Sequence, residues 1–296
     1  MTDLPLDQVR TLLAAVDEGT FEAAARALAV TPSAVSQRIK ELEKRTGRIL
    51  LVRSKPVQPT ESGVALIRFA RQLAALEHDA AAELGLPGTN EPALVSIAVN
   101  ADSLATWFVP ALARVPRDPP VRFELHREDQ EYTDELLRQG TVMAAVTASG
   151  LPLPGCTVRN LGRMRYRALA TPQFVERWLS AGPLKQAVGA APVVIFNRRD
   201  ELQDRFVRRL GRQARCGPRH YVPASDAFLE AVEAGLGWGM IPDVQPAGRE
   251  GRRLVEIAPG NPIDVRLYWQ QWKLSPPALA AVGHAVAQVA AEVLSA

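Results

Sequence analysis

Apolar residues recur at helical spacing through the first 45 residues of the chain and predict three short helices. The first apolar stripe ends at Gly19 and consists of Leu6, Val9, Leu12, Leu13 and Val16. The second consists of Phe21, Ala24, Ala25 and Leu28, and the third of Val35, Ile39 and Leu42. Ala29, Val30 and Thr31 make the connection between the second helix and the third. Thr31 suits an N-cap and Pro32 the first helical position, so we expect a tight helix-turn-helix.

The opposite face of the third helix carries small hydroxyls, an amide and cations rather than ion pairs. Serine and glutamine hydrogen-bond base edges, and lysine neutralises phosphate, so this face suits a major groove. The alternative is an ordinary helical hairpin with a polar exterior. The predicted DNA-binding residues are Thr31, Ser33, Ala34, Ser36, Gln37, Arg38, Lys40, Arg53 and Lys55.

Residues 31–60 hold seven Lys or Arg and only two Glu, although the whole chain has a formal charge of only +3. This local excess fits a surface that faces phosphate. Residues 49–52 are expected to form a wing strand, and the turn with Arg53 and Lys55 lies beside the third helix. A basic turn is often merely solvated, but this position favours contact with DNA.

A long Ala-rich helix is predicted from Ser62 to Leu84, with Thr60 as its N-cap. Its apolar positions are spaced three and four residues apart, as in a coiled-coil seam. The alternative is a helix that packs only within its own subunit. The residues predicted to pair with a second copy of the chain are Leu66, Phe69, Leu73, Leu76 and Ala80.

Residues 85–92 have the composition of a hinge, and beyond them strands alternate with helices, which is typical of an α/β domain with a largely parallel sheet. We expect strands at 94–100, 121–129, 142–148, 165–172, 192–197, 219–223, 237–243 and 265–271. We expect helices at 102–115, 132–140, 173–179, 201–210 and 225–234, and a closing helix from Pro277.

Polar residues gather where these strands end, and ligands of open parallel sheets bind at that edge. A helix start with Ser103 and Thr106 can hold a carboxylate, and the acidic residues can hold a cation, a combination that suits a basic amino acid. For any one of these residues, a cap or a solvated loop is an equal alternative. The predicted effector-binding residues are Asn100, Asp102, Ser103, Thr106, Trp107, Glu128, Asp129, Thr147, Asn197, Arg198, Asp200 and Asp226.

Composition and motifs argue against several other classes of protein. The 47% hydrophobic and 23% charged residues are ordinary for a water-soluble chain, and no apolar run is long enough to cross a membrane. The two cysteines and four histidines form no metal-ligand spacing, and no nucleophile elbow is present. We expect no cofactor, no metal, no catalytic residues and a cytoplasmic location.

The stretch AAARALAVTPSAVSQRIKELE (23–43), followed by GRILLVRSKPVQPTESG (47–63), resembles the helix-turn-helix and wing of LysR-type transcriptional regulators. Further pieces resemble the ArgP/LysG branch of that family: NADSLATWF (100–108), LLRQGTVMAAVT (136–147), ATPQF (170–174), DELQDR (200–205), GLGWGMIP (235–242) and YWQQWKL (268–274). This chain departs from the pattern of the branch at Asn197-Arg198-Arg199. This basic run either holds the effector carboxylate or disfavours a cationic ligand.

The resemblance implies a winged helix-turn-helix (1–60), a linker and dimerisation helix (61–86), a hinge (87–92) and an effector-binding domain (93–296). That domain would have two lobes like a periplasmic binding protein, about 93–164 with 268–296, and about 165–267. The implied function is a regulator controlled by lysine, arginine or histidine and acting on an amino acid exporter gene. The implied partners are a double-stranded operator, a homodimer or homotetramer, and RNA polymerase as a further candidate. A nucleoid or replication-control protein with broad sequence preference is the alternative.

Overall fold

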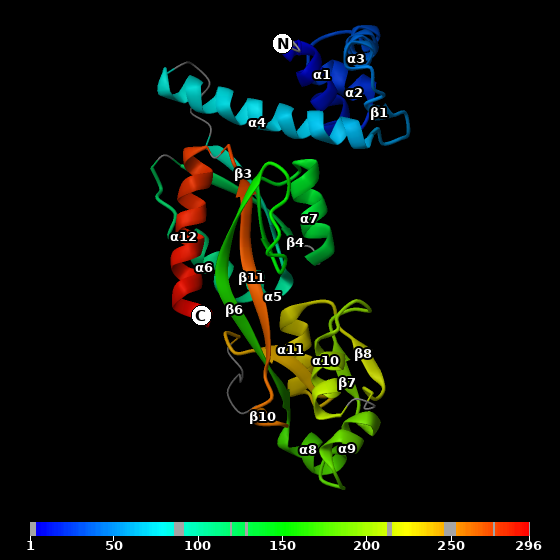
Figure 1. Cartoon of the computed structure of the whole chain (residues 1–296), viewed down its shortest axis with the longest axis vertical. Helices are drawn as coiled ribbons and strands as arrows, with labels where there is room; N and C mark the ends of the chain where they lie inside the picture. Colours follow the sequence, from blue (N-terminus) through cyan, green and yellow to red (C-terminus); the bar gives the residue numbers. More distant parts are fainter. Residues whose placement is uncertain are drawn as a thin grey trace.

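The computed structural model of the chain describes residues 4–85, 92–118, 120–127, 130–211, 215–245, 253–274 and 276–295. An N-terminal head, a long helix across its base and a two-lobed domain follow one another along the molecule (Figure 1). Most of the predicted hinge, 87–92, lies outside the described residues.

The head consists of three helices and a two-stranded wing. Thr31 caps the third helix as predicted, because its Oγ1 accepts a hydrogen bond from the Ala34 N–H at 3.2 Å. The wing is shorter than the predicted strand at 49–52, since only Leu51 and Val52 pair with the returning chain. The elements are α1 (Leu6–Asp17), α2 (Phe21–Ala27), α3 (Pro32–Thr46), β1 (Leu51–Val52) and β2 (Gln58–Pro59).

The long helix α4 (Glu61–Glu83) connects the head with the two-lobed domain. Ile67 and Ala70 are buried in the core of the head, and Ala75 packs against the core of the larger domain. Gly140 permits the close approach of the two parts: a Cβ there would lie 2.9 Å from the Arg68 Cα, and its φ of 69° is left-handed. The position of α4 on the domain therefore depends on glycine at 140.

The two-lobed domain is built around a seven-stranded mixed sheet, in the order β10-β6-β11-β5-β3-β4 with β9 paired to β6. The elements of the upper lobe, lobe I, are β3 (Ala93–Val99), α5 (Ala101–Ser103), a π-helical turn η1 (Leu104–Phe108), α6 (Val109–Leu112), β4 (Val121–Arg127), α7 (Gln130–Gln139), β5 (Ala144–Thr147) and α12 (Pro277–Val293). In Figure 1, α12 and α6 lie on one side of this lobe and α7 on the other.

The lower lobe, lobe II, is connected to lobe I by two long strands that run through both lobes, β6 (Cys156–Ala170) and β11 (Ile263–Trp272) (Figure 1). The lobe boundaries expected at 164–165 and 267–268 fall within these two strands. The other elements of lobe II are α8 (Pro172–Trp178), α9 (Leu184–Ala190), β7 (Val193–Ile195), α10 (Leu202–Leu210), β8 (Arg219–Tyr221), α11 (Ser225–Glu233), β9 (Gly239–Pro242) and β10 (Val255–Glu256).

Three details of the fold differ from the sequence prediction. The sheet is mixed rather than largely parallel, because β6 and β11 are antiparallel to each other and β11 is antiparallel to β5. The helix expected at 102–115 is interrupted by the π turn, next to Pro110, which has no N–H to donate to the helical ladder. The short elements α9 and β10 were not predicted.

Candidate functional site

The first candidate site is the exposed face of α3 in the head. Ser33, Gln37 and Lys40 are exposed there, while Val35, Ile39 and Leu42 are buried on the opposite face. Thr31 and Ser33 share a hydrogen bond of 2.9 Å between their hydroxyls, and Ala34 and Ser36 are half-buried at the edge of the face. Short polar side chains near a helix start leave room for the helix to approach base edges closely.

Two of the predicted DNA-binding side chains have partners within the head. The Gln37 amide donates to Glu41 Oε1 at 3.0 Å, so it is oriented but exposed. Arg38 faces α1, where its guanidinium lies 3.9 Å from Asp7 Oδ2 and donates to Thr11 Oγ1 at 3.4 Å. Arg38 therefore ties α3 to α1 in this structure, and its contact with DNA stays a prediction.

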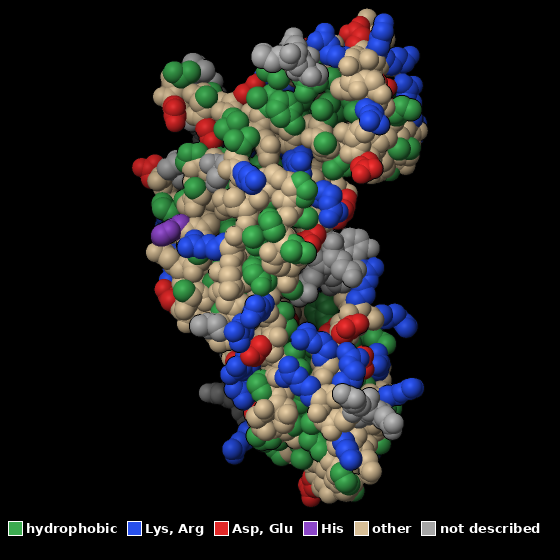
Figure 2. Space-filling model, viewed as in Figure 1, with side chains coloured by type: hydrophobic (Ala, Val, Ile, Leu, Met, Phe, Trp, Pro, Cys, Tyr) green, Lys and Arg blue, Asp and Glu red, His purple; other side chains and the backbone are tan. Residues whose placement is uncertain are grey.

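The wing turn supplies two exposed cations, Arg53 and Lys55. The Arg53 guanidinium lies 6.0 Å from the centre of the Phe21 ring, which orients it beside α2. Figure 2 shows Lys and Arg side chains gathered on the outer face of the head. This distribution matches the positive local charge of residues 31–60.

The predicted seam on α4 is divided between two environments. Leu66 packs against the core of the head, whereas Phe69, Leu76 and Ala80 are exposed and Leu73 is half-buried. Exposed large apolar side chains on one face of a helix are typical of an association surface.

The second candidate site lies between the lobes and is centred on the carboxylate of Asp102, a residue of the short helix α5 that follows β3. Tyr166 on the crossing strand β6 donates to Asp102 Oδ2 at 2.8 Å, and Ser225 at the start of α11 donates to Asp102 Oδ1 at 2.7 Å. Asp102 therefore joins lobe I, a crossing strand and lobe II. Neither Tyr166 nor Ser225 was among the predicted site residues.

The electrostatics of this junction are unusual. Burial raises the pKa of the Asp102 carboxyl above its ordinary value, the hydrogen bonds from Ser225 and Tyr166 lower it, and the charge of Asp200 raises it further. Burial and the nearby Asp102 also hold the pKa of Tyr166 well above 10. No ion pair to either Asp102 or Asp200 is found within the described ranges. Two carboxylates at one junction without a cation favour a positively charged ligand.

Asp200 belongs to a tight turn between β7 and α10. Its carboxylate accepts from the Phe196 and Leu202 N–H groups at 3.1 and 3.0 Å, and Asn197 Oδ1 accepts from the N–H groups of Arg199 and Asp200. Arg198 is exposed, and its guanidinium lies 5.1 Å from the centre of the Tyr221 ring. Asn197 and Asp200 thus shape the loop, and Arg198 lies on the surface of lobe II.

The other predicted effector residues lie in several surroundings. Asn100 caps α5 by accepting from the Ser103 N–H at 2.8 Å, and Thr106 donates to the Asp102 carbonyl at 2.6 Å. Among the described residues, the buried Ser103 hydroxyl has no hydrogen-bond partner. Thr147 is buried and donates to Asp134 at 3.2 Å.

Trp107 and Asp226 take no part in the two hydrogen bonds to the Asp102 carboxylate. Trp107 is in the core, edge-on to Phe108, whereas Asp226 is exposed in the first turn of α11. Glu128 and Asp129 lie outside the described residues.

The described part of the chain contains no group of three or more His, Cys, Asp and Glu side chains that could hold a metal ion. None of its helices is long and apolar enough to cross a membrane.

The two parts of the chain that contain the candidate sites each match a family model. Residues 6–64 match the model of the bacterial regulatory helix-turn-helix protein, lysR family, and residues 90–291 match the LysR substrate binding domain. The chain is 44% identical over 288 residues to the HTH-type transcriptional regulator LysG of Mycobacterium tuberculosis, covering 95% of this chain and 93% of that protein. These relatives are regulators and not enzymes.

Solved structures give the same result. The crystal structure of ArgP from Mycobacterium tuberculosis superposes with a TM-score of 0.90 at 43% identity, covering 97% of this chain and 98% of that one. Full-length LysG from Corynebacterium glutamicum with bound effector Arg superposes with a TM-score of 0.85 at 38% identity, covering 99% and 100%.

Proposed function

Because the chain belongs to the LysR family of bacterial transcriptional regulators, we propose that a basic amino acid bound between its two lobes controls its binding to an operator. The observation that carries the proposal is the pair of carboxylates at the lobe junction: the charge of Asp200 raises the pKa of Asp102, and neither carboxylate has an ion pair among the described residues. The relative with bound effector Arg supports the same ligand class.

A basic amino acid has a carboxylate, an α-ammonium and a distal cation. We assign one cationic group to the Asp102 carboxylate, with Asp129 as a further acceptor, and the effector carboxylate to the Ser103 region. The buried Ser103 hydroxyl, which has no partner in the described structure, is a donor for that carboxylate. Arg198 on lobe II is a second candidate to close over it.

The mechanism follows from the links of Asp102 to both lobes. A cation at Asp102 contacts lobe I and lies beside Tyr166 and Ser225, so it stabilises the arrangement in which the lobes meet. Since α4 rests on lobe I and carries the head, a change in packing of the lobes is transmitted to the DNA-binding heads of an oligomer. The proposal includes the division of the chain into a DNA-binding domain (1–60), a linker and dimerisation helix (61–86) and an effector-binding domain (93–296).

We further propose that the target is an amino acid exporter gene and that the protein acts in the cytoplasm, where operator DNA and free amino acids are together. One relative is the lysine export transcriptional regulatory protein LysG of Corynebacterium glutamicum, which is 41% identical over 288 residues. The alternative of a nucleoid or replication-control protein has no support from these relatives.

Isothermal titration of the full chain with arginine, lysine, histidine and norleucine tests the effector class. We expect at least one basic amino acid to bind and norleucine, which lacks the distal cation, to bind at least tenfold more weakly. Asp102→Asn keeps the size of the side chain but removes its charge, so affinity for the basic amino acid should also fall about tenfold or more. Binding of none of the three, or equal affinity for norleucine, would overturn the proposal.

A further inference from the structure

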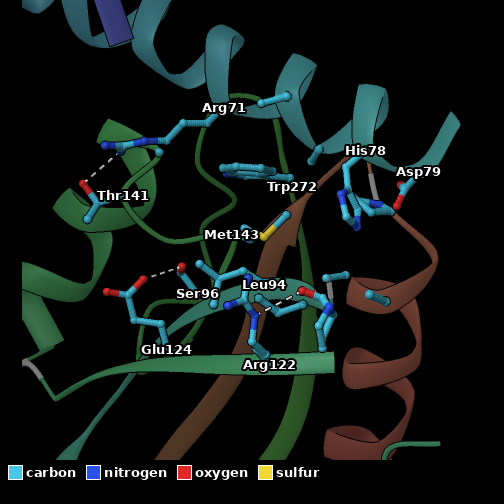
Figure 3. Close-up of a pocket in the computed structure, with 18 of the residues that line it drawn as sticks. Arg71, His78, Asp79, Leu94, Ser96, Arg122, Glu124, Thr141, Met143 and Trp272 are labelled. Carbon is cyan, nitrogen blue, oxygen red and sulfur yellow. Dashed lines mark hydrogen bonds between the residues drawn. The ribbon is translucent and has the colours of Figure 1, made fainter. Parts of the chain in front are cut away.

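A cavity lies between the linker helix α4 and the edge of the sheet formed by β3 and β4 (Figure 3). Its volume is about 560 Å³, which is within the usual range for small-molecule sites. None of the residues that link the lobes at Asp102 lines it. The cavity is therefore separate from the proposed effector site.

Three buried polar atoms among its lining residues have no hydrogen-bond partner in the described part of the chain. They are Asp79 Oδ2, His126 Nε2 and Trp272 Nε1. Trp272 is only 2% exposed, and Figure 3 shows its ring within the cavity between Arg71 and Met143. His126 Nε2 lies 3.6 Å from Glu124 Oε1, so Asp79 Oδ2 and Trp272 Nε1 are the atoms that indicate a ligand, because buried polar groups are rarely left without partners.

Two of the other charged groups along the cavity, Arg71 and Glu124, already have partners. Arg71 donates to Asp17 at 2.5 Å and to Thr141 at 3.4 Å, and Glu124 accepts from the Ser96 hydroxyl at 2.9 Å. Asp79 has no ion pair within the described ranges; burial raises the pKa of its carboxyl, and the neighbouring His78 lowers it in part. A cation placed beside Asp79 would stabilise the ionised carboxylate.

We propose that this cavity binds a small amphiphilic amine, with its ammonium at Asp79 and its apolar body against Ala75, Leu94 and Met143. Trp272 Nε1 is a donor, so a ligand that also carries an acceptor gains a second hydrogen bond. His126 lies 3.6 Å from Glu124 and can serve as donor or acceptor.

Such a ligand would contact both parts of the regulator. Leu13 and Asp17 of the head and Ala74 and Ala75 of α4 line one side of the cavity, and strands of lobe I line the other. An occupant therefore fixes the head relative to the effector-binding domain, and it does so without reaching the lobe junction. The cavity would act as a second regulatory site.

The test uses three probes of similar shape on the full chain: 2-phenylethylamine, 2-phenylethanol and 3-phenylpropionate. We expect saturable titration of one 2-phenylethylamine per chain and at least tenfold weaker binding of the neutral and anionic probes. Saturating arginine should leave 2-phenylethylamine binding intact. Absence of saturable amine binding, or competition by arginine, would overturn the proposal.

Variants on the same helix locate the site. Asp79→Asn should weaken 2-phenylethylamine about tenfold or more. Glu77→Gln removes a carboxylate that is paired with Arg10 outside the cavity, so it should change amine binding less than twofold. Leu94→Trp fills the cavity from a half-exposed position and should abolish amine binding. Unchanged amine binding in both Asp79→Asn and Leu94→Trp would contradict the proposal. Titration of the same variants with arginine measures the effector site separately.

Discussion

Ser225 at the start of α11 donates its hydroxyl hydrogen to Asp102 Oδ1 at 2.7 Å, which joins lobe II to the end of the first strand of lobe I. Hydrogen bonds to a charged group contribute about 1.5–3 kcal/mol. This one is made only when the lobes meet, so it biases the protein toward the arrangement that we propose for effector binding.

Ser225→Ala should therefore weaken binding of the basic effector about tenfold in isothermal titration, because closing the lobes no longer gains this hydrogen bond. Ser180→Ala is a matched control, since Ser180 is exposed and its hydroxyl, within the described residues, donates to the Glu176 carbonyl of the same lobe. If both variants bind the effector like the wild type, the Ser225–Asp102 contact has no part in the response.

The head could be predicted from the sequence almost completely, because its information is local. Apolar spacing, the Thr31 cap and Pro32 act within one or two helical turns. The mixed sheet could not be predicted in the same way. The pairing of Arg165 with Asp264 on β6 and β11 joins positions 99 residues apart, and no local pattern fixes that register.

The effector site was only partly predictable for the same reason. Asp102 could be identified from its place at the end of a strand. Tyr166 could not, because it is a buried residue within a strand, where the sequence pattern predicts burial and says nothing of a hydrogen bond to Asp102. Arg38 has the residue type of a DNA contact, yet its neighbours on α1 became apparent only in the folded head. Trp107 was predicted at the site and lies in the core.

Gln37→Ala tests the docking of α3 in a major groove. Loss of the amide should cost roughly 1–3 kcal/mol and blur base preference at one position of each half-site. Arg53→Ala should instead weaken all sequences alike and reduce the salt slope by about one. Lys185→Ala, an exposed lysine on α9, controls for total charge. Fluorescence anisotropy with operator variants at several salt concentrations gives both quantities, and an operator preference indifferent to Gln37→Ala would contradict this docking.

Leu73→Glu tests the exposed seam on α4. If two copies pair along this face, the variant places two carboxylates in an apolar helix pair, which is costly without a cation. It should sediment as a monomer and lose operator affinity, because one head contacts only a half-site. Gln186→Glu adds the same charge at an exposed position on α9 of lobe II and should sediment like the wild type. An unchanged sedimentation coefficient for Leu73→Glu would mean that the seam packs within one subunit.

The raised pKa of Asp102 predicts how stability changes with pH. A carboxyl whose pKa is higher in the folded than in the unfolded protein loses protons more readily on unfolding, so the folded state becomes less stable as pH rises from 3.8 through the folded pKa. Asn cannot ionise, so Asp102→Asn should gain free energy of unfolding relative to wild type as pH rises, and the difference should close in acid.

Asp264→Asn provides the opposite slope, because hydrogen bonds from Arg165, at 2.8 and 3.0 Å, lower the pKa of Asp264. For this residue the wild type should be the more stable protein at neutral pH and lose that advantage as pH falls below 3.8. Urea unfolding of wild type and both variants between pH 3 and 8 measures the two slopes. Saturating arginine should reduce the Asp102 slope alone, since a cation at that carboxylate lowers its folded pKa. Slopes of the same sign would show that the Asp102 carboxyl is not held in the environment described for the lobe junction.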